Sequence, residues 1–361
     1  MKRFTVFALL SLFCSWVYAD VLTLKTGHPD TYVVKKGDTL WDISGIFLKD
    51  PWHWPKLWGV NPQIANPHLI YPGDRLTLVF IDGEPRLVNK PMLRSSPAGR
   101  VDPKGNAVPL VDLALIDPYL TQNRIVDADW LSQQPMVLGG ESPSLHHVMD
   151  NIVYIGANLP VGTKLGIYQP GRRFSNEASG EALGQEAILT ATGRVTESGD
   201  VSKVLLLNNF RETKAGFRVF AVDDAFISAY LMPSAGTAVG AKVLASERDI
   251  REMGKFDVAY IDRGQQDGVI PGQVFTIVKP GAEVIINNDG VPVQPNEQST
   301  YDKLLASMAP ADVVKLPELY RGQLMVFKVF DKVSMGLILV DKRPVRQGDM
   351  LLAPTTLLQE E

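Results

Sequence analysis

Apolar residues recur with a helical spacing in the first quarter of the chain. Leu40, Ile43 and Phe47 fall at i, i+3 and i+7, which predicts one face of an α-helix. Residues 32–34 before it and 75–79 after it have the composition of short strands, and the second stretch alternates apolar and polar positions. This part of the chain therefore mixes a helical and a strand period.

Turn and capping residues give the order of these elements. Gly37 permits a tight turn, and Asp38 or Thr39 can cap the helix that follows. Pro55 suits the start of a second helix, which Asn61-Pro62 ends. The pattern predicts a strand, two helices and a closing strand.

From about residue 150 the pattern changes to short strands separated by glycine turns, and it occurs twice. Residues 150–171 match residues 256–281, with Tyr154 and Tyr260 in register. Two further matches pair 193–207 with 327–340 and 215–222 with 347–354. Repeated units with short, evenly spaced strands predict small barrels or sandwiches.

These patterns together predict an α+β chain, in which a βααβ domain precedes a mainly β region made of two repeated units. The expected bounds are 30–80 for the βααβ domain, 81–109 for a linker rich in Pro and Gly, 110–235 for the first β-rich unit and 236–361 for the second. Smaller expected elements are short helices at 117–118 and 127–134, a strand between the copies at 241–246, a hairpin at INNDGVP and a helix near 299–308.

The first nineteen residues have the pattern of a cleaved signal peptide. Lys2 and Arg3 precede an apolar run, and Val17 and Ala19 have the spacing of a signal-peptidase site. We expect cleavage after Ala19, a periplasmic location and a mature chain without a transmembrane segment. Cys14 is the only cysteine, so the mature chain can form no disulfide, thiolate metal site or cysteine nucleophile.

Net charge and the positions of the histidines exclude further classes of function. The formal charge is -4, and loss of the two basic residues of the acid-free signal makes it -6. A net acidic exported chain has no electrostatic reason to bind nucleic acid or anionic lipid. All the histidines precede residue 148, at positions 28, 53, 68, 146 and 147. We therefore expect no catalytic residues, no metal site and no cofactor in the repeats.

Three motifs in the βααβ region carry a specific resemblance. GDTLW at 37–41, VNPQI at 60–64 and LIYPGDRL at 69–76 occur in the order typical of LysM domains, which this segment resembles. LysM modules bind the N-acetylated sugars of peptidoglycan or chitin in a shallow groove between two loops. The resemblance implies a groove formed by Gly37, Asp38, Thr39, Leu40, Asn61, Pro62, Leu69 and Ile70. Backbone amides there would bond the acetamido carbonyl, and Leu40 and Ile70 would cover its methyl group.

Tryptophan is concentrated in the same region, with four of the six inside residues 41–58. Trp54, Leu57 and Trp58 have i, i+3, i+4 spacing, which predicts packing of the second helix onto the first. Trp52 breaks that spacing, and Trp41 lies beside the expected groove. Both are candidates for aromatic contact, either with a sugar ring or with a neighbouring domain.

The whole chain resembles the type IV pilus secretin-associated protein family. The resemblance rests on the LysM motifs, the Pro-rich linker, AVPLVDLALIDPYLTQNRIVDADWL at 107–131, NIVYIGANLPVGTKLGIYQPGRRF and GEALGQEAILTATGRV. It implies a non-catalytic adaptor that anchors an outer-membrane secretin ring at the cell wall, with a C-terminal part similar to a flagellar assembly T-protein domain. Two alternatives stay open: a peptidoglycan hydrolase targeted by its LysM domain, and an adaptor for a flagellar ring or another secretin.

Overall fold

The structure is a computed structural model that describes residues 22–59, 70–89, 123–142, 144–176, 179–222, 231–237, 240–286, 290–293, 298–308 and 313–354. The expected signal peptide, the later part of the expected linker and the expected helix at 117–118 lie outside the described residues.

The N-terminal domain has the predicted order of elements. These are β1 (Thr31–Val33), α1 (Leu40–Phe47), the 3-10 helix η1 (Pro51–His53), α2 (Trp54–Leu57), β2 (Arg75–Ile81) and β3 (Glu84–Asn89). β1 pairs with β2, and β2 pairs with β3, all antiparallel. The predicted helix face is confirmed, since Ile43 and Phe47 are fully buried and Leu40 is nearly so.

The third strand corrects the prediction that an irregular linker starts at residue 81. Asp82 and Gly83 both have positive φ, as a two-residue hairpin turn requires, and they return the chain alongside β2. Pro85 is tolerated because β3 is an edge strand. The Asp82-Gly83 dipeptide is typical of a two-residue hairpin turn. The prolines around it favoured an irregular linker instead.

The first β-rich unit is a six-stranded barrel of described strands with two additional elements. Its elements are β4 (Asn123–Val126), α4 (Ala128–Gln133), β5 (Val137–Gly140), β6 (Ile152–Ile155), β7 (Lys164–Ser175), β8 (Ala182–Glu197), β9 (Ser202–Asn209) and β10 (Arg218–Phe220). The order around the sheet is β5-β6-β9-β8-β7-β10. Hydrogen bonds between Val137 and residues 216–217 close it into a barrel.

The second unit repeats this topology. Its elements are β11 (Ser234–Ala235), β12 (Ala241–Ser246), β13 (Val258–Ile261), the 3-10 helix η3 (Gln265–Asp267), β14 (Gln273–Lys279), β15 (Glu283–Ile286), β16 (Pro292–Val293), α5 (Thr300–Met308), β17 (Val313–Lys315), β18 (Leu319–Val329), β19 (Ser334–Asp341) and β20 (Met350–Leu352). Among the described strands the order β12-β13-β19-β18-β14-β20 matches the first barrel strand for strand, and pairing of β20 with β12 closes it. The predicted duplication and the barrel option are therefore confirmed.

One detail of the expected boundaries changes and another agrees. Residues 241–246 form the expected strand, which as β12 is the first strand of the second barrel and lies inside the expected bounds 236–361. β11 pairs with β14, so residues 234–235 belong with the second barrel instead of closing the first unit. The helix at 128–133, the helix at 300–308 and the β15–β16 hairpin agree with the predictions.

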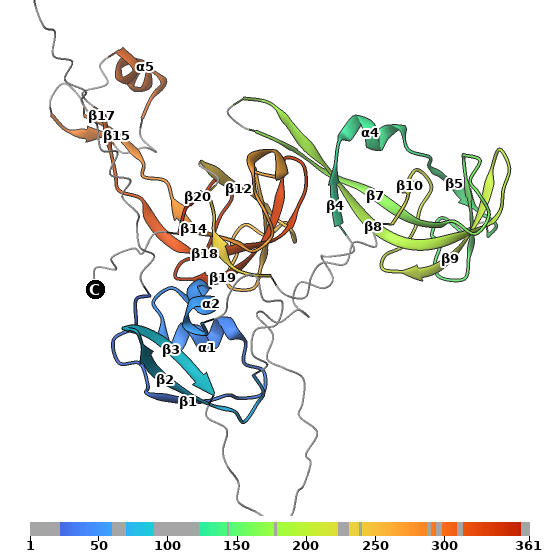
Figure 1. Cartoon of the computed structure of the whole chain (residues 1–361). Coiled ribbons are helices and arrows are strands. Elements are labelled where there is room, and N and C mark those ends of the chain that lie inside the picture. Colours follow the sequence, from blue (N-terminus) through green and yellow to red (C-terminus); the bar gives the residue numbers. More distant parts are fainter. Residues whose placement is uncertain are drawn as a thin grey trace, which may run out of the picture.

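Each barrel carries an extension between equivalent strands, β7 and β8 in the first and β14 and β18 in the second. In the first barrel the two long strands run on beyond the barrel as a hairpin, to which β4 adds. We call residues 170–186 the first arm. In the second barrel the extension is β15, β16, α5 and β17, which we call the second arm, residues 283–319. Figure 1 shows the second arm and the β5 end of the first barrel at opposite ends of the molecule.

Candidate glycan-binding site

The N-terminus of α1 forms one side of the expected groove. Thr39 is the N-cap, with its hydroxyl accepting a hydrogen bond from the Asp42 amide at 3.0 Å and donating one to the Asp42 carboxylate at 2.6 Å. Gly37, at φ +94°, turns the chain into the cap in a conformation that side chains with a Cβ rarely adopt. No neighbouring atom lies within 4 Å of a Cβ built there, so the backbone at Gly37 is open to a ligand.

Asp38 fixes the loop before the helix. Its carboxylate accepts hydrogen bonds from the Lys35 amide at 2.8 Å and from the Tyr32 hydroxyl at 2.9 Å. Burial, and then the hydrogen bond to Asp38, raise the pKa of Tyr32 to about 12, so the phenol keeps its proton and continues to donate. Asp38 thus shapes the loop through one carboxylate oxygen, Oδ2, which accepts both of these hydrogen bonds.

The loop on the other side of the groove is tied directly to the first. The Gly73 amide donates to the Val34 carbonyl at 2.8 Å, and the Val34 amide donates to the Asp74 carbonyl at 2.9 Å. The Asp74 carboxylate in turn accepts from the Tyr71 amide. Two loops separated by more than thirty residues in sequence therefore lie side by side, as the LysM resemblance implies.

The apolar groove residues are more buried than expected. Leu40 and Ile70 belong to the same hydrophobic cluster and expose 6% and 3% of their surface. A ligand would meet their edges rather than open side chains. Asn61, Pro62 and Leu69 lie outside the described residues, so their predicted part in the groove stays a prediction.

The tryptophans divide between the domain core and a contact with the second barrel. Trp54 and Trp58 meet edge to face at 6.4 Å between ring centroids, and Leu57 is fully buried beside them, which confirms the core packing predicted from their spacing. Trp41 and Trp52 are only 4% and 8% exposed.

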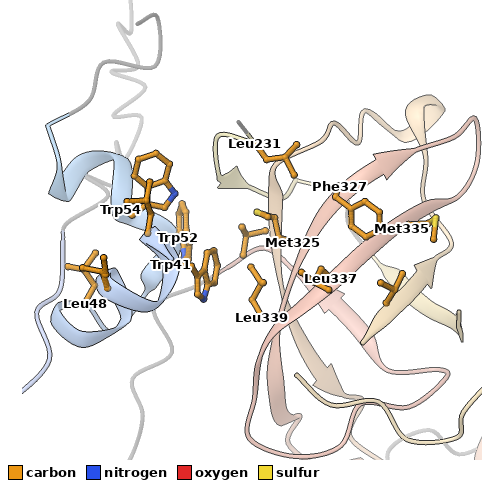
Figure 2. Close-up of a cluster of buried hydrophobic side chains, with 14 of the residues drawn as sticks. Trp41, Leu48, Trp52, Trp54, Leu231, Met325, Phe327, Met335, Leu337 and Leu339 are labelled. Atoms are coloured by element: carbon orange, nitrogen blue, oxygen red, sulfur yellow. The ribbon is translucent and has the colours of Figure 1, made fainter. Parts of the chain in front are cut away.

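Figure 2 shows what covers this second pair. Trp41 and Trp52 face Met325 of β18 and Leu339 of β19, and all four belong to one buried cluster. Of the two contacts considered from sequence, the structure shows the neighbouring domain. The partner side chains lie nearly 300 residues away in the chain, so nothing local to the tryptophans could identify them.

Polar groups support the same contact between domains. Lys255 Nζ lies 3.4 Å from the Asp42 carboxylate, and both side chains are 41% exposed. Burial, and then the charge of Asp50, raise the pKa of Tyr320 to about 12. Because exposed ion pairs contribute little, the apolar contact carries most of this docking. Asp42 therefore joins the Thr39 cap at the groove to the surface of the second barrel.

Other candidate chemistry is sparse in the described part of the chain. No group of three or more His, Cys, Asp or Glu side chains is placed to hold a metal ion there. The His146 ring lies against the Glu212 carboxylate, while His147 is buried and pairs through its backbone with Thr213. Within the same residues no helix has the length and apolar character needed to cross a bilayer.

Comparison with known proteins agrees with the geometry of the N-terminal domain. The LysM domain family matches residues 32–79. A relative described as uncharacterized protein YqbP, from Bacillus subtilis (strain 168), is 45% identical over 60 residues, which cover 14% of this chain and 27% of that protein. The chain thus aligns with about a quarter of that relative's length. LysM domains commonly bind cell-wall glycans, and the family match and the paired loops identify residues 32–79 as a LysM domain.

Proposed function

We propose that this chain binds peptidoglycan through the loop pair at 34–40 and 70–74. The supporting observation is the LysM match over these loops together with their direct backbone hydrogen bonds. The exposed backbone at Gly37 supplies the surface that an acetamido group needs. Lys35 and Lys36 flank it, and Asp38 and Asp74 offset their charge, so the site suits an uncharged glycan.

A competition experiment tests this part of the proposal. Soluble N-acetylglucosamine oligomers should displace the full chain from purified sacculi, while glucose oligomers of equal length should not, because they lack the acetamido group. Raising the salt concentration should change the retained fraction little. Equal displacement by both sugars, or loss of binding in salt alone, would contradict a groove that reads N-acetyl groups.

We further propose that the chain is a non-catalytic periplasmic adaptor that anchors the secretin ring of a type IV pilus near the outer membrane. Export rests on the pattern of residues 1–19. The adaptor role is supported by a glycan-binding head on a body of two strand-rich barrels, and by the resemblance of the whole chain to the secretin-associated family. The non-catalytic part of the proposal rests on the sequence, which has no cysteine after Cys14 and no histidine after His147.

Two assays on one preparation test the adaptor role. The chain should co-purify with the pilus secretin from solubilised envelopes, and it should release no dye from labelled sacculi. Co-purification with a flagellar ring or another secretin would contradict the pilus secretin as the partner and would identify that assembly instead. Dye release that survives further purification would favour the hydrolase instead.

A further inference from the structure

The two barrels can be compared position by position, because they share even their irregularities. β5 pairs with β6 through Val137–Ile155 and Gly139–Tyr154, with a bulge between these pairs. β12 pairs with β13 through Val243–Ile261 and Ala245–Tyr260, with a bulge at the same place. Tyr154 and Leu138 are thus the structural equivalents of Tyr260 and Leu244.

The outer face of β13 and β19 in the second barrel is covered. Strand side chains alternate between the inside and the outside of a barrel, and the outward set on β13 and β19 is Val258, Tyr260, Met335, Leu337 and Leu339. None of these exposes more than 3% of its surface. They belong to the cluster that also holds Trp41 and Trp52 of the LysM domain and Phe174 and Leu183 of the first arm.

The first arm holds its part of this face with specific contacts. The Phe174 ring lies 5.1 Å from the Tyr260 ring, and Arg172 donates to the Ser246 carbonyl at 2.7 Å. Glu186 of the arm accepts a hydrogen bond from the Tyr260 hydroxyl at 2.8 Å. A hairpin that extends from one barrel therefore packs on the β12–β13–β19 surface of the next barrel.

The equivalent surface of the first barrel remains partly open. We call it the first-barrel outer face: Leu138, Ile152, Tyr154, Leu205 and Leu207. Leu138 is 51% exposed, whereas its equivalent on β12, Leu244, is half-buried. The other four are half-buried, whereas their equivalents on β13 and β19 are covered. An aromatic ring and four aliphatic side chains lie on this sheet face. Lys203 lies on the same face, opposite Tyr154, where the second barrel has Met335, and its ammonium is paired with Glu197 at 2.9 Å.

The second arm occupies the same place in the second barrel as the first arm does in the first barrel. Like the first-barrel outer face, it has exposed apolar side chains. Tyr301, Leu304 and Met308 fall at i, i+3 and i+7 on α5 and are 67%, 53% and 73% exposed. Val314 of β17 adds a further exposed aliphatic side chain. The second arm and the first-barrel outer face lie at opposite ends of the molecule, so they do not meet within one chain (Figure 1).

We propose that the second arm of one copy docks on the first-barrel outer face of another copy, and so repeats between chains the arm-on-barrel packing that joins the two barrels within a chain. The occupant is a second copy because this chain already contains that mode of contact, with its donor hairpin and its acceptor face at equivalent positions of the repeat. Such a contact joins unlike surfaces. Because the arm and the face lie at opposite ends of the chain, each docked copy keeps its own second surface free, and the proposed contact propagates head to tail as an open or closed series.

Sedimentation of the full chain over a range of concentrations tests the proposal. The unaltered chain should form a series of oligomers. Leu205→Glu on the face and Leu304→Glu on the arm should each weaken self-association at least about tenfold, because each places a charge in the centre of an apolar contact. Phe80→Glu, at an exposed apolar residue of the LysM domain, is the matched control and should leave association unchanged.

Mixing the two variants gives the decisive readout. The face variant keeps a working arm and the arm variant keeps a working face, so an equal mixture should form dimers and stop there. Two-fold self-association would instead leave the mixture no better than either variant alone, and this result would overturn the proposal. A chain that stays monomeric at every concentration would overturn it as well.

Discussion

At the residue scale, Thr39 shows how a local signal becomes structure. Sequence alone allowed either Asp38 or Thr39 to cap α1, and the structure assigns the cap to Thr39 and the preceding loop to Asp38. Thr39→Ala should lower the free energy of unfolding of the LysM domain by about 1 kcal/mol, and Thr39→Ser should recover most of it. Tryptophan fluorescence during urea unfolding measures both, since four of the six tryptophans lie in this domain. Equal loss in both variants would contradict a capping role.

Arg172 is a residue whose role could not be predicted from sequence, because it joins Glu186 of its own arm to the Ser246 carbonyl of the second barrel. It pairs at 3.2 Å with Glu186, whose side chain is only 4% exposed. Arg172→Met should lower the free energy of unfolding by about 2 kcal/mol, less than for a fully buried pair because Arg172 is partly exposed. Adding Glu186→Gln should restore part of the loss by removing the unpaired charge. Calorimetry of the single and double variants decides this, and an additive loss would contradict it.

At the element scale, short-range patterns predicted most elements, while long-range contacts decided what covers them. The spacing of Leu40, Ile43 and Phe47 identified α1, and the repeat identified both barrels. β3 was missed because prolines outweighed the Asp82-Gly83 turn, and the cover on Trp41 depends on strands far along the chain. The alternation of side chains along a strand shows which residues point out of a barrel. It does not show which other element covers them.

The docking of the LysM domain on β18 and β19 gives a prediction at this scale. Leu339→Lys should release the domain, because it places a charge beneath Trp41 and Trp52, and small-angle scattering should then show a larger radius of gyration. Leu207→Lys is the matched control, since it alters the equivalent position of the first barrel, where no LysM domain docks. An unchanged radius in the Leu339 variant, or an equal increase in both at low concentration, would contradict the docking.

The same contact should respond to alkaline pH. The pKa of Tyr320 is about 12 in the docked chain, against an ordinary value of 10.0. Burial contributes most to this shift and the charge of Asp50 in the LysM domain contributes next, so the folded chain favours the protonated phenol. This contribution is complete below pH 10 and is lost as the pH rises through about 12. Asp50→Asn should lower the pKa of Tyr320 by removing a nearby negative charge. Tyrosinate absorbance, taken as the difference between each protein and its Tyr320→Phe variant, measures the shift, and an unchanged pKa would place Asp50 outside the contact.

At the scale of the whole molecule, one LysM domain is packed on a body of two equivalent barrels. Trp41 and Trp52 dock the LysM domain on the body, so the groove at the Thr39 cap has a fixed orientation relative to the barrels while the domain is docked. Sequence predicted the parts and their order. It could not predict this orientation, which depends on Met325 and Leu339 lying opposite two tryptophans (Figure 2).

Co-sedimentation of the full chain with purified sacculi tests the central claim most directly, that the loops at 34–40 and 70–74 hold peptidoglycan. The comparison is between Leu40→Val at the groove and Leu76→Val in the core of the same domain, two buried leucines whose truncation costs a similar roughly 1 kcal/mol. Both variants should stay folded by fluorescence. We predict that only Leu40→Val weakens retention. Equal retention of the two variants, or retention of a chain that lacks residues 22–89, would contradict the account.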